Sequence, residues 1–161
     1  MKVFKEAQKF TQVWVILLFI LLNSFFLYGI YQQFILKIPF GDNPMPNSVL
    51  ILSTIGFILL TLFFFSMKLK TTIDETGIYY QFYPIQLKAK KISWSALKYA
   101  SVVTFNPILD YGGWGIKHNS YTVKGRIGIQ LVLKSGKKLL IGTQKEQNAT
   151  RVLETYQKKM K

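Results

Sequence analysis

Two long stretches without charged residues dominate the hydrophobic pattern of the chain, at residues 13–36 and 48–67. At about 1.5 Å of rise per residue, each can cross the roughly 30 Å hydrocarbon core of a bilayer as a helix. The first follows a basic N-terminus, as in a signal peptide, but it is too long for a signal peptide's apolar core and no small-residue cleavage pattern follows it. For the second, the alternative is a buried helix of a soluble protein, which rarely needs such a long uncharged run. The pattern predicts two membrane-spanning helices.

The segment between the two stretches, residues 37–47, contains three prolines and a glycine, so neither helix continues through it. A connection this short predicts an antiparallel helical hairpin. Lysines flank the outer ends of both stretches, whereas the connection carries one lysine and one aspartate. By the positive-inside rule, both termini and everything after residue 67 are expected on the cytoplasmic side of the cell inner (plasma) membrane.

From residue 69 onward the pattern changes to the short alternating runs that are typical of β-strands. Asp74–Gly77 has the composition of a tight turn between the first two strands. Lys134–Lys137 is a second turn, between two runs that alternate strictly. The predicted strands cover residues 69–73, 78–83, 88–93, 98–105, 121–124, 127–133 and 139–141.

A single amphipathic helix is predicted at the C-terminus. Thr143 and Glu146 have the spacing of a capping box, in which each side chain accepts a hydrogen bond from the other residue's backbone amide. The apolar positions that follow recur with helical spacing and form one stripe: Ala149, Val152, Leu153, Tyr156 and Met160.

The stretch Asp110–Gly115 contains three glycines in four positions, which indicates positive φ angles or a close approach of backbone. It lacks the Gly-Lys-Ser/Thr of a phosphate loop and the third glycine of a dinucleotide fingerprint. Two interpretations of Trp114 remain open. It packs back onto the domain, or it is exposed beside Lys117 for the membrane interface or a partner.

Composition limits the chemistry. The chain has no cysteine, which excludes disulfides, thiolate catalysis and cysteine metal sites. One histidine, His118, and seven scattered acidic residues do not make a predicted metal site or catalytic constellation, so we expect no enzyme activity and no cofactor.

The net charge is +14, from 21 Lys+Arg against 7 Asp+Glu. In a protein with membrane spans, such an excess predicts attraction to the anionic inner leaflet. Nucleic acid is the alternative partner, through a basic-aromatic face made by Lys88, Lys90 and Lys91 with Trp94 and Tyr99. A membrane tether favours the lipid interpretation.

Three segments carry a resemblance to a known family: Lys91–Leu97, Asp110–Lys117, and Gly128–Leu131 with Leu140–Gln144. On these segments the chain resembles the bacterial membrane-anchored PH-domain-like (bacterial pleckstrin-homology) proteins, over roughly residues 69–155. Lys145-Glu146 departs from the proline expected at the start of the helix.

The resemblance implies an α+β membrane protein with two domains. Residues 1–67 would form a basic N-terminus and a transmembrane hairpin. Residues 69–161 would form a PH-like β-barrel or sandwich of about seven strands with one C-terminal α-helix. PH-like folds bind lipid head groups or peptides, and fold alone does not decide between them. The phosphoinositide site of such folds uses a basic first hairpin loop, whereas the first loop expected here, Asp74–Gly77, is acidic.

We therefore expect a non-enzymatic, membrane-anchored binding module, a scaffold or accessory subunit that recognises a protein partner at the inner membrane surface. The alternative is a sensor of lipid head groups or of the envelope state. The candidate contact residues are Asp110, Tyr111, Trp114 and Lys117, together with Lys88, Lys90 and Lys91.

Overall fold

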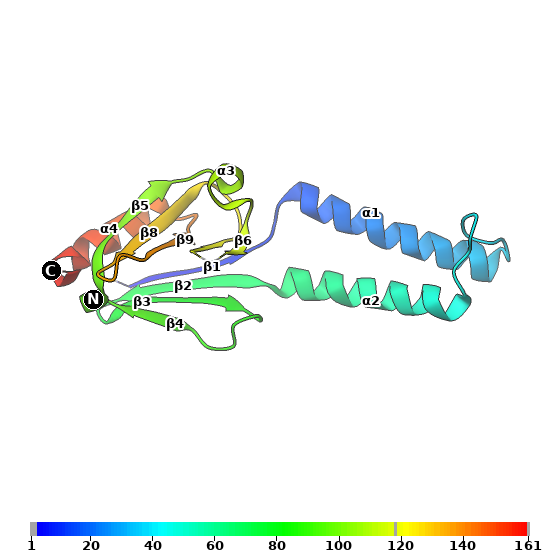
Figure 1. Cartoon of the computed structure of the whole chain (residues 1–161), viewed down its shortest axis with the longest axis horizontal. Coiled ribbons are helices and arrows are strands. Elements are labelled where there is room, and N and C mark those ends of the chain that lie inside the picture. Colours follow the sequence, from blue (N-terminus) through cyan, green and yellow to red (C-terminus); the bar gives the residue numbers. More distant parts are fainter. Residues whose placement is uncertain (1–2, 118, 161) are drawn as a thin grey trace. The chain divides into compact units, whose positions relative to one another are not determined.

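A computed structural model describes residues 3–117 and 119–160 (Figure 1). The chain divides into two compact units. One consists of residues 11–66, and the other joins residues 1–10 to residues 67–161. His118 lies outside the described residues.

The unit of residues 11–66 is a pair of antiparallel helices. It contains α1 (Val13–Ile30), which the π-helical turn η1 (Tyr31–Ile35) extends, and α2 (Asn47–Ser66). Both are long and apolar enough to cross a membrane, as the sequence predicts. The Asn23 side-chain amide donates to the Thr61 hydroxyl across the pair at 3.0 Å, which satisfies a polar group that hydrocarbon would leave without partners.

The first sheet of the other unit has four antiparallel strands in the order β1-β2-β3-β4. These are β1 (Phe4–Lys9), β2 (Lys68–Asp74), β3 (Gly77–Tyr83) and β4 (Lys90–Ser93). The β2–β3 turn matches the expected one, because the Asp74 carboxylate accepts hydrogen bonds from the Thr76 amide and hydroxyl and from the Gly77 amide. The Thr76 hydrogen bond is the main reason that the pKa of Asp74 is lowered.

Strand β1 corrects the expectation for the N-terminus. The sequence predicts a basic N-terminus and a transmembrane hairpin over residues 1–67, but Phe4 to Lys9 pair in register with Ile73 to Lys68 of β2. The helical pair is therefore an insertion between two neighbouring strands of one sheet. It follows that Asp74–Gly77 joins the second and third strands, so the expectation that it is the first hairpin loop was wrong.

The second sheet has the order β5-β8-β9-β7-β6. Its strands are β5 (Leu97–Thr104), β6 (Gly115–Lys117), β7 (Ser120–Thr122), β8 (Ile127–Leu133) and β9 (Lys138–Gly142). All pairs are antiparallel except β7 with β9. The 3₁₀ turn η2 (Trp94–Ala96) links the sheets, and α3 (Pro107–Tyr111) follows β5. The short strand β6 and the helix α3 were not predicted.

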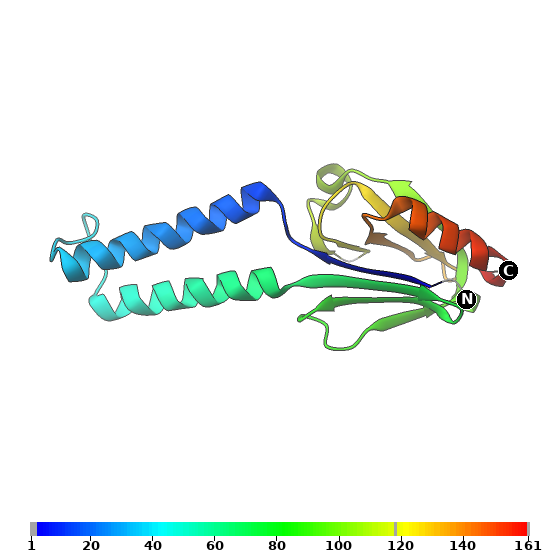
Figure 2. The same cartoon turned by 180° about the vertical axis from the view of Figure 1, so that it is seen from behind.

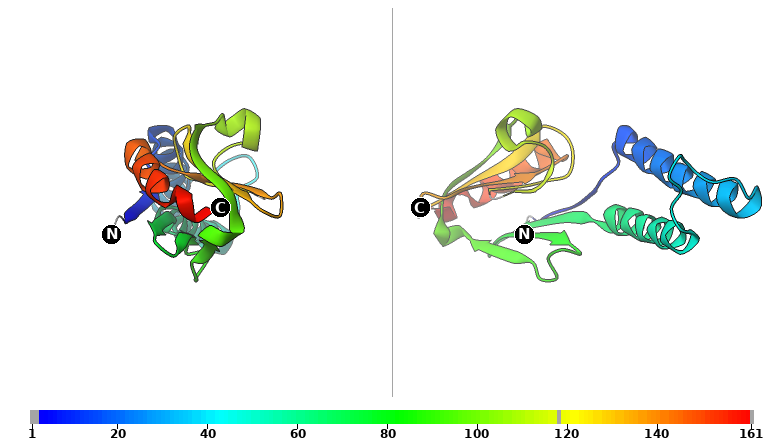
Figure 3. Two further views of the ribbon diagram at one scale, coloured as in Figure 1. Left: turned by 90° about the vertical axis from the view of Figure 1, so that its left-hand side faces the viewer. Right: turned by 45° about the vertical axis from the view of Figure 1, so that its right-hand side comes forward.

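The C-terminal helix α4 (Glu146–Tyr156), followed by the 3₁₀ turn η3 (Gln157–Met160), contacts β1, β5 and β8 (Figures 2 and 3). The expected apolar stripe is buried and packs into a core that both sheets supply. Trp94 is 4% exposed, stacks on Tyr156 at 5.2 Å between ring centroids, and donates its indole N–H to the Asp74 carbonyl. The helix thus holds the link between the sheets.

The capping box at the start of this helix does not form. The helix begins one residue after Lys145, which makes no side-chain cap hydrogen bond, and the Thr143 amide donates to the Ile127 carbonyl instead. The Thr143 hydroxyl accepts from the Lys145 amide and donates to the Glu6 carboxylate. The carboxylate that binds the segment before the helix is therefore Glu6 on β1, from the other end of the chain.

Candidate functional site: a basic groove between the first strand and the C-terminal helix

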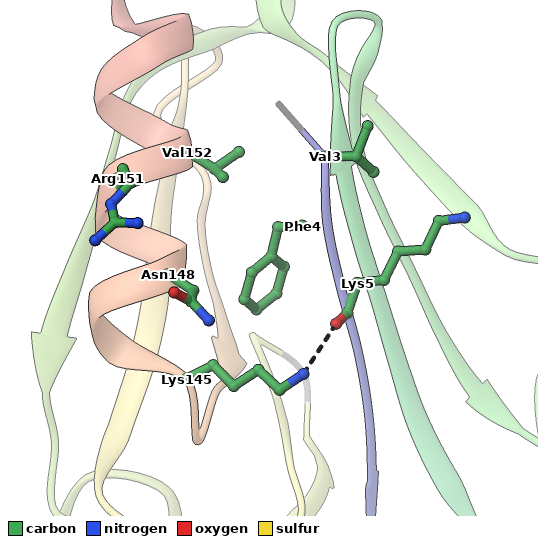
Figure 4. Close-up of a pocket in the computed structure, with 7 residues that line it drawn as sticks. All are labelled: Val3, Phe4, Lys5, Lys145, Asn148, Arg151 and Val152. Atoms are coloured by element: carbon green, nitrogen blue, oxygen red, sulfur yellow. Dashed lines mark hydrogen bonds between the residues drawn. The ribbon is translucent and has the colours of Figure 1, made fainter. Parts of the chain in front are cut away.

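A groove of about 770 Å³ runs between β1 and α4 (Figure 4). Figure 4 shows Phe4 between the helix and the strand, and Phe4 and Val152 are nearly buried, at 3% and 6% exposed. We call this groove the basic groove. It is lined by Val3, Phe4, Lys5, Lys145, Asn148, Arg151 and Val152.

The charge of the basic groove is entirely positive. Lys5, Lys145 and Arg151 are exposed, and no acidic residue is among the described residues that line the groove. The acidic residues of α4, Glu146 and Glu154, line a separate cavity between α4 and β5. Helix α4 therefore presents cations toward β1 and carboxylates toward β5, which favours an anionic ligand on the β1 side only.

Strand β1 also presents the outer edge of its backbone to the groove. It is the outer strand of its sheet, and the Lys5 carbonyl points away from β2 to accept from the Lys145 ammonium at 3.4 Å. In an antiparallel pair, alternate residues direct both backbone groups outward, so Val3 and Ala7 share the orientation of Lys5. A free strand edge beside an apolar floor suits an extended peptide that adds as a further strand.

Glu6 holds the wall of the groove in place. Glu6 is 9% exposed, and its carboxylate accepts from the Thr143 hydroxyl at 2.7 Å and the Gln144 amide at 2.9 Å. The next inward side chain, Gln8, donates to the Gly142 carbonyl at 2.6 Å. These bonds tie β1 to the segment that leads into α4, and the negative charge lies near the positive end of the helix dipole.

The glycine-rich stretch has mainly structural contacts. The Asn106 side chain accepts from the Ile108 and Leu109 amides, and the Asp110 carboxylate accepts from the Asn106 amide at 2.7 Å. Tyr111 packs edge-on against Phe105, and burial, then the nearby charge of Asp110, raises the pKa of Tyr111. The three glycines have positive φ, as expected.

Trp114 packs back onto the domain, which is the first of the two interpretations that the sequence leaves open. Its side chain is partly buried, and the indole N–H donates to the Gly125 carbonyl at 3.0 Å. Lys117 is exposed on β6, three residues away. Asp110, Tyr111 and Trp114 thus shape one loop, and none of them lines the basic groove.

The lysines around β4 do not form one surface. Lys88 is exposed in the loop before the strand. Lys90 donates to the Tyr121 hydroxyl at 3.3 Å, while Lys91 lies 5.3 Å from the ring centroid of Tyr79. Side chains of adjacent strand residues point to opposite faces, so these two lysines are separated by the sheet.

The basic-aromatic face expected for nucleic acid is therefore not assembled, since the burial of Trp94 also removes its main stacking ring. Within the described part of the chain, no group of three or more His, Asp or Glu side chains could hold a metal ion. Sequence reasoning missed the basic groove, because its residues come from the two ends of the chain. No protein-family model matches this chain, and a search of curated protein sequences also finds no match.

Proposed function

We propose that the protein is a membrane-anchored, PH-like binding module that recognises an acidic, extended segment of a protein partner at the inner membrane surface. The observation that carries the proposal is the basic groove itself, which combines three cations, an apolar floor and a free strand edge in a unit joined to two apolar helices.

The PH-like assignment is supported by architecture. A four-stranded antiparallel sheet is followed by a second sheet and a C-terminal helix that packs against both. In such an arrangement, the helix closes an opening between the sheets and strand edges stay available for ligands.

Membrane anchoring is supported by the helices and by strand pairing. Because Lys9 pairs with Lys68, the chain leaves and re-enters the domain at neighbouring positions. If α1 enters a membrane, α2 must return to the same side, so the two helices cross together. Lysines at both crossings favour the cytoplasmic side for the domain.

The ligand class follows from the groove. Carboxylates on a partner would meet Lys5, Lys145 and Arg151, and an apolar side chain would cover Phe4 and Val152. The backbone at Val3, Lys5 and Ala7 would supply ladder hydrogen bonds. An anionic lipid head group is the second candidate, since phosphate oxygens suit the same three cations.

The test is site-specific crosslinking in native membranes. A photo-reactive phenylalanine analogue at Val3, which is 44% exposed, is expected to form an adduct with a protein under ultraviolet light. The double change Lys145→Glu with Arg151→Glu should lower the adduct at least about tenfold, because like charges across an interface cost several kcal/mol.

The matched control is Lys134→Glu with Lys137→Glu, an equal charge change in the exposed β8–β9 turn, which should leave the adduct unchanged. A lipid adduct with the same dependence on Lys145 and Arg151 would support the head-group alternative. Crosslinking that is indifferent to both double variants would contradict the proposed site.

A further inference from the structure

Four large aliphatic side chains lie in water at one end of the domain. Ile85 and Leu87, in the β3–β4 loop, are 55% and 79% exposed, and Ile108 and Leu109, on α3, are 66% and 82% exposed. We call these four residues the apolar rim. Isolated exposed aliphatic residues are common, but two such pairs at the same end of the domain indicate an interaction surface.

The apolar rim lies at the end of the domain where the chain departs for the helices. Tyr83, which ends β3, pairs with Lys68, which pairs in turn with Lys9. The β3–β4 loop thus begins beside the last residue of β1 and the first of β2. Figures 1 and 2 show α3 at the same end, on the other side of β1 and β2 from this loop.

Both loops are fixed by hydrogen bonds that leave the aliphatic side chains outside. In the β3–β4 loop, the Gln81 side chain donates to the carbonyls of Gln86 and Leu87, and the Gln86 side chain accepts from the Phe82 amide. In α3, Asn106 and Asp110 cap the turn that displays Ile108 and Leu109. The exposed aliphatic side chains therefore belong to segments that these hydrogen bonds hold in place.

The charged residues around the rim are mostly basic. Exposed cations at this end include Lys9, Lys70, Lys88 and Arg126. The acidic residue of α3, Asp110, already accepts the Asn106 amide. Tyr111 ends α3, Trp114 follows it three residues later, and both are partly buried. Exposed aliphatic side chains with aromatic residues and cations nearby are typical of surfaces that contact an anionic membrane interface.

Chain length limits how far this end can be from the helices. Helix α1 begins four residues after Lys9, and α2 ends two residues before Lys68. At about 3.4 Å per residue, the connections reach roughly 7 to 14 Å. If the helices span a membrane, the end of the domain that carries the apolar rim is held near the lipid head groups.

We propose that the apolar rim inserts into the head-group region of the bilayer, so that the domain sits on the membrane by this end. The inference rests on the proposed function only in that the helices span the membrane. It adds a lipid contact that fixes the orientation of the domain, with the basic groove along its side.

Spin labels in the full-length protein test this contact, and the absence of native cysteine makes single-cysteine variants straightforward. Leu87→Cys and Leu109→Cys are labelled in vesicles of phosphatidylcholine and phosphatidylglycerol. The ratio of collisions with oxygen to collisions with a water-soluble nickel complex should be several-fold higher than for Ser135→Cys, in the exposed β8–β9 turn. Ratios equal to that of Ser135→Cys would overturn the proposal.

A spin label at Leu59→Cys, in the apolar helix α2, tests the membrane span separately from the lipid contact of the apolar rim. A lipid signal at residue 59 with a water signal at residues 87 and 109 would overturn the lipid contact alone. A water signal at residue 59 would contradict the membrane span, and with it both proposals.

Discussion

A protein in which residues 11–66 are replaced by Asn-Gly is expected to fold as a soluble domain, whereas the fragment 67–161, without β1, is expected not to fold. Lys9 and Lys68 are register partners, so Phe10 and Met67 come next and a two-residue turn can join them. Asn-Gly favours the type I′ turn whose twist matches an antiparallel hairpin.

The reason for the second half of this expectation is the burial that β1 supplies. Phe4 is 3% exposed in the core, and loss of a buried phenylalanine side chain alone costs about 3–5 kcal/mol. Removal of the strand also breaks the Glu6 and Gln8 hydrogen bonds and exposes the edge of β2. A domain of this size is stable by only about 5–15 kcal/mol.

Thermal unfolding followed by circular dichroism, with amide dispersion in two-dimensional NMR, distinguishes the two proteins. We expect one cooperative transition for the Asn-Gly protein and none for the fragment. A fragment that unfolds cooperatively at the same temperature as the Asn-Gly protein would contradict the assignment of β1 to the domain.

Replacement of Glu6 by alanine is expected to destabilise the Asn-Gly protein by roughly 2–3 kcal/mol. The change leaves the Thr143 hydroxyl and the Gln144 amide without their buried acceptor, and hydrogen bonds to a charged group contribute about 1.5–3 kcal/mol. It also removes a negative charge near the N-terminal end of α4.

Chemical denaturation gives this difference directly. Glu154→Ala is the matched control, because Glu154 is an exposed acid of α4 and such surface changes usually stay within about 0.5 kcal/mol. Glu6→Gln keeps an acceptor and should fall between the two. Equal stabilities for Glu6→Ala and Glu154→Ala would show that the carboxylate does not hold β1 to the helix.

The sequence predicts those parts of the fold whose pattern is local. The two apolar helices, the Asp74–Gly77 turn, the β8–β9 hairpin and the buried stripe of α4 all follow from spacing within about twenty residues. In the β8–β9 hairpin and in α4 the buried positions are largely apolar, so the period of the pattern shows directly. The helices α1 and α2 show instead as long uncharged stretches.

Strand β1 could not be predicted from the local hydrophobic pattern. Its inward positions are Phe4, Glu6 and Gln8, so two of the three buried side chains are polar and the alternation is hidden. Their burial is tolerated because Thr143, Gln144 and Gly142 provide hydrogen bonds, and these partners lie at the far end of the chain. The basic residues between them resemble an ordinary positive flank of a membrane helix.

The basic groove was hidden for the same reason. Arg151 lies on the polar side of an amphipathic helix, which normally faces only water, and Lys145 comes just before that helix. They become part of a site because β1 runs beside that helix. The candidate contacts of the glycine-rich stretch, in contrast, were chosen for an unusual composition, and their capping and packing contacts explain that composition.

The measurement that tests anchoring most directly is the labelling of two single-cysteine variants with a membrane-impermeant maleimide. Asn43→Cys lies in the connection between α1 and α2, and Ser135→Cys lies in the β8–β9 turn. We expect Asn43→Cys to react in intact cells and Ser135→Cys to react only after lysis, because in the proposed topology both helices cross the membrane and the domain stays in the cytoplasm. Reaction of both variants only after lysis, or reaction of Ser135→Cys in intact cells, would contradict this topology.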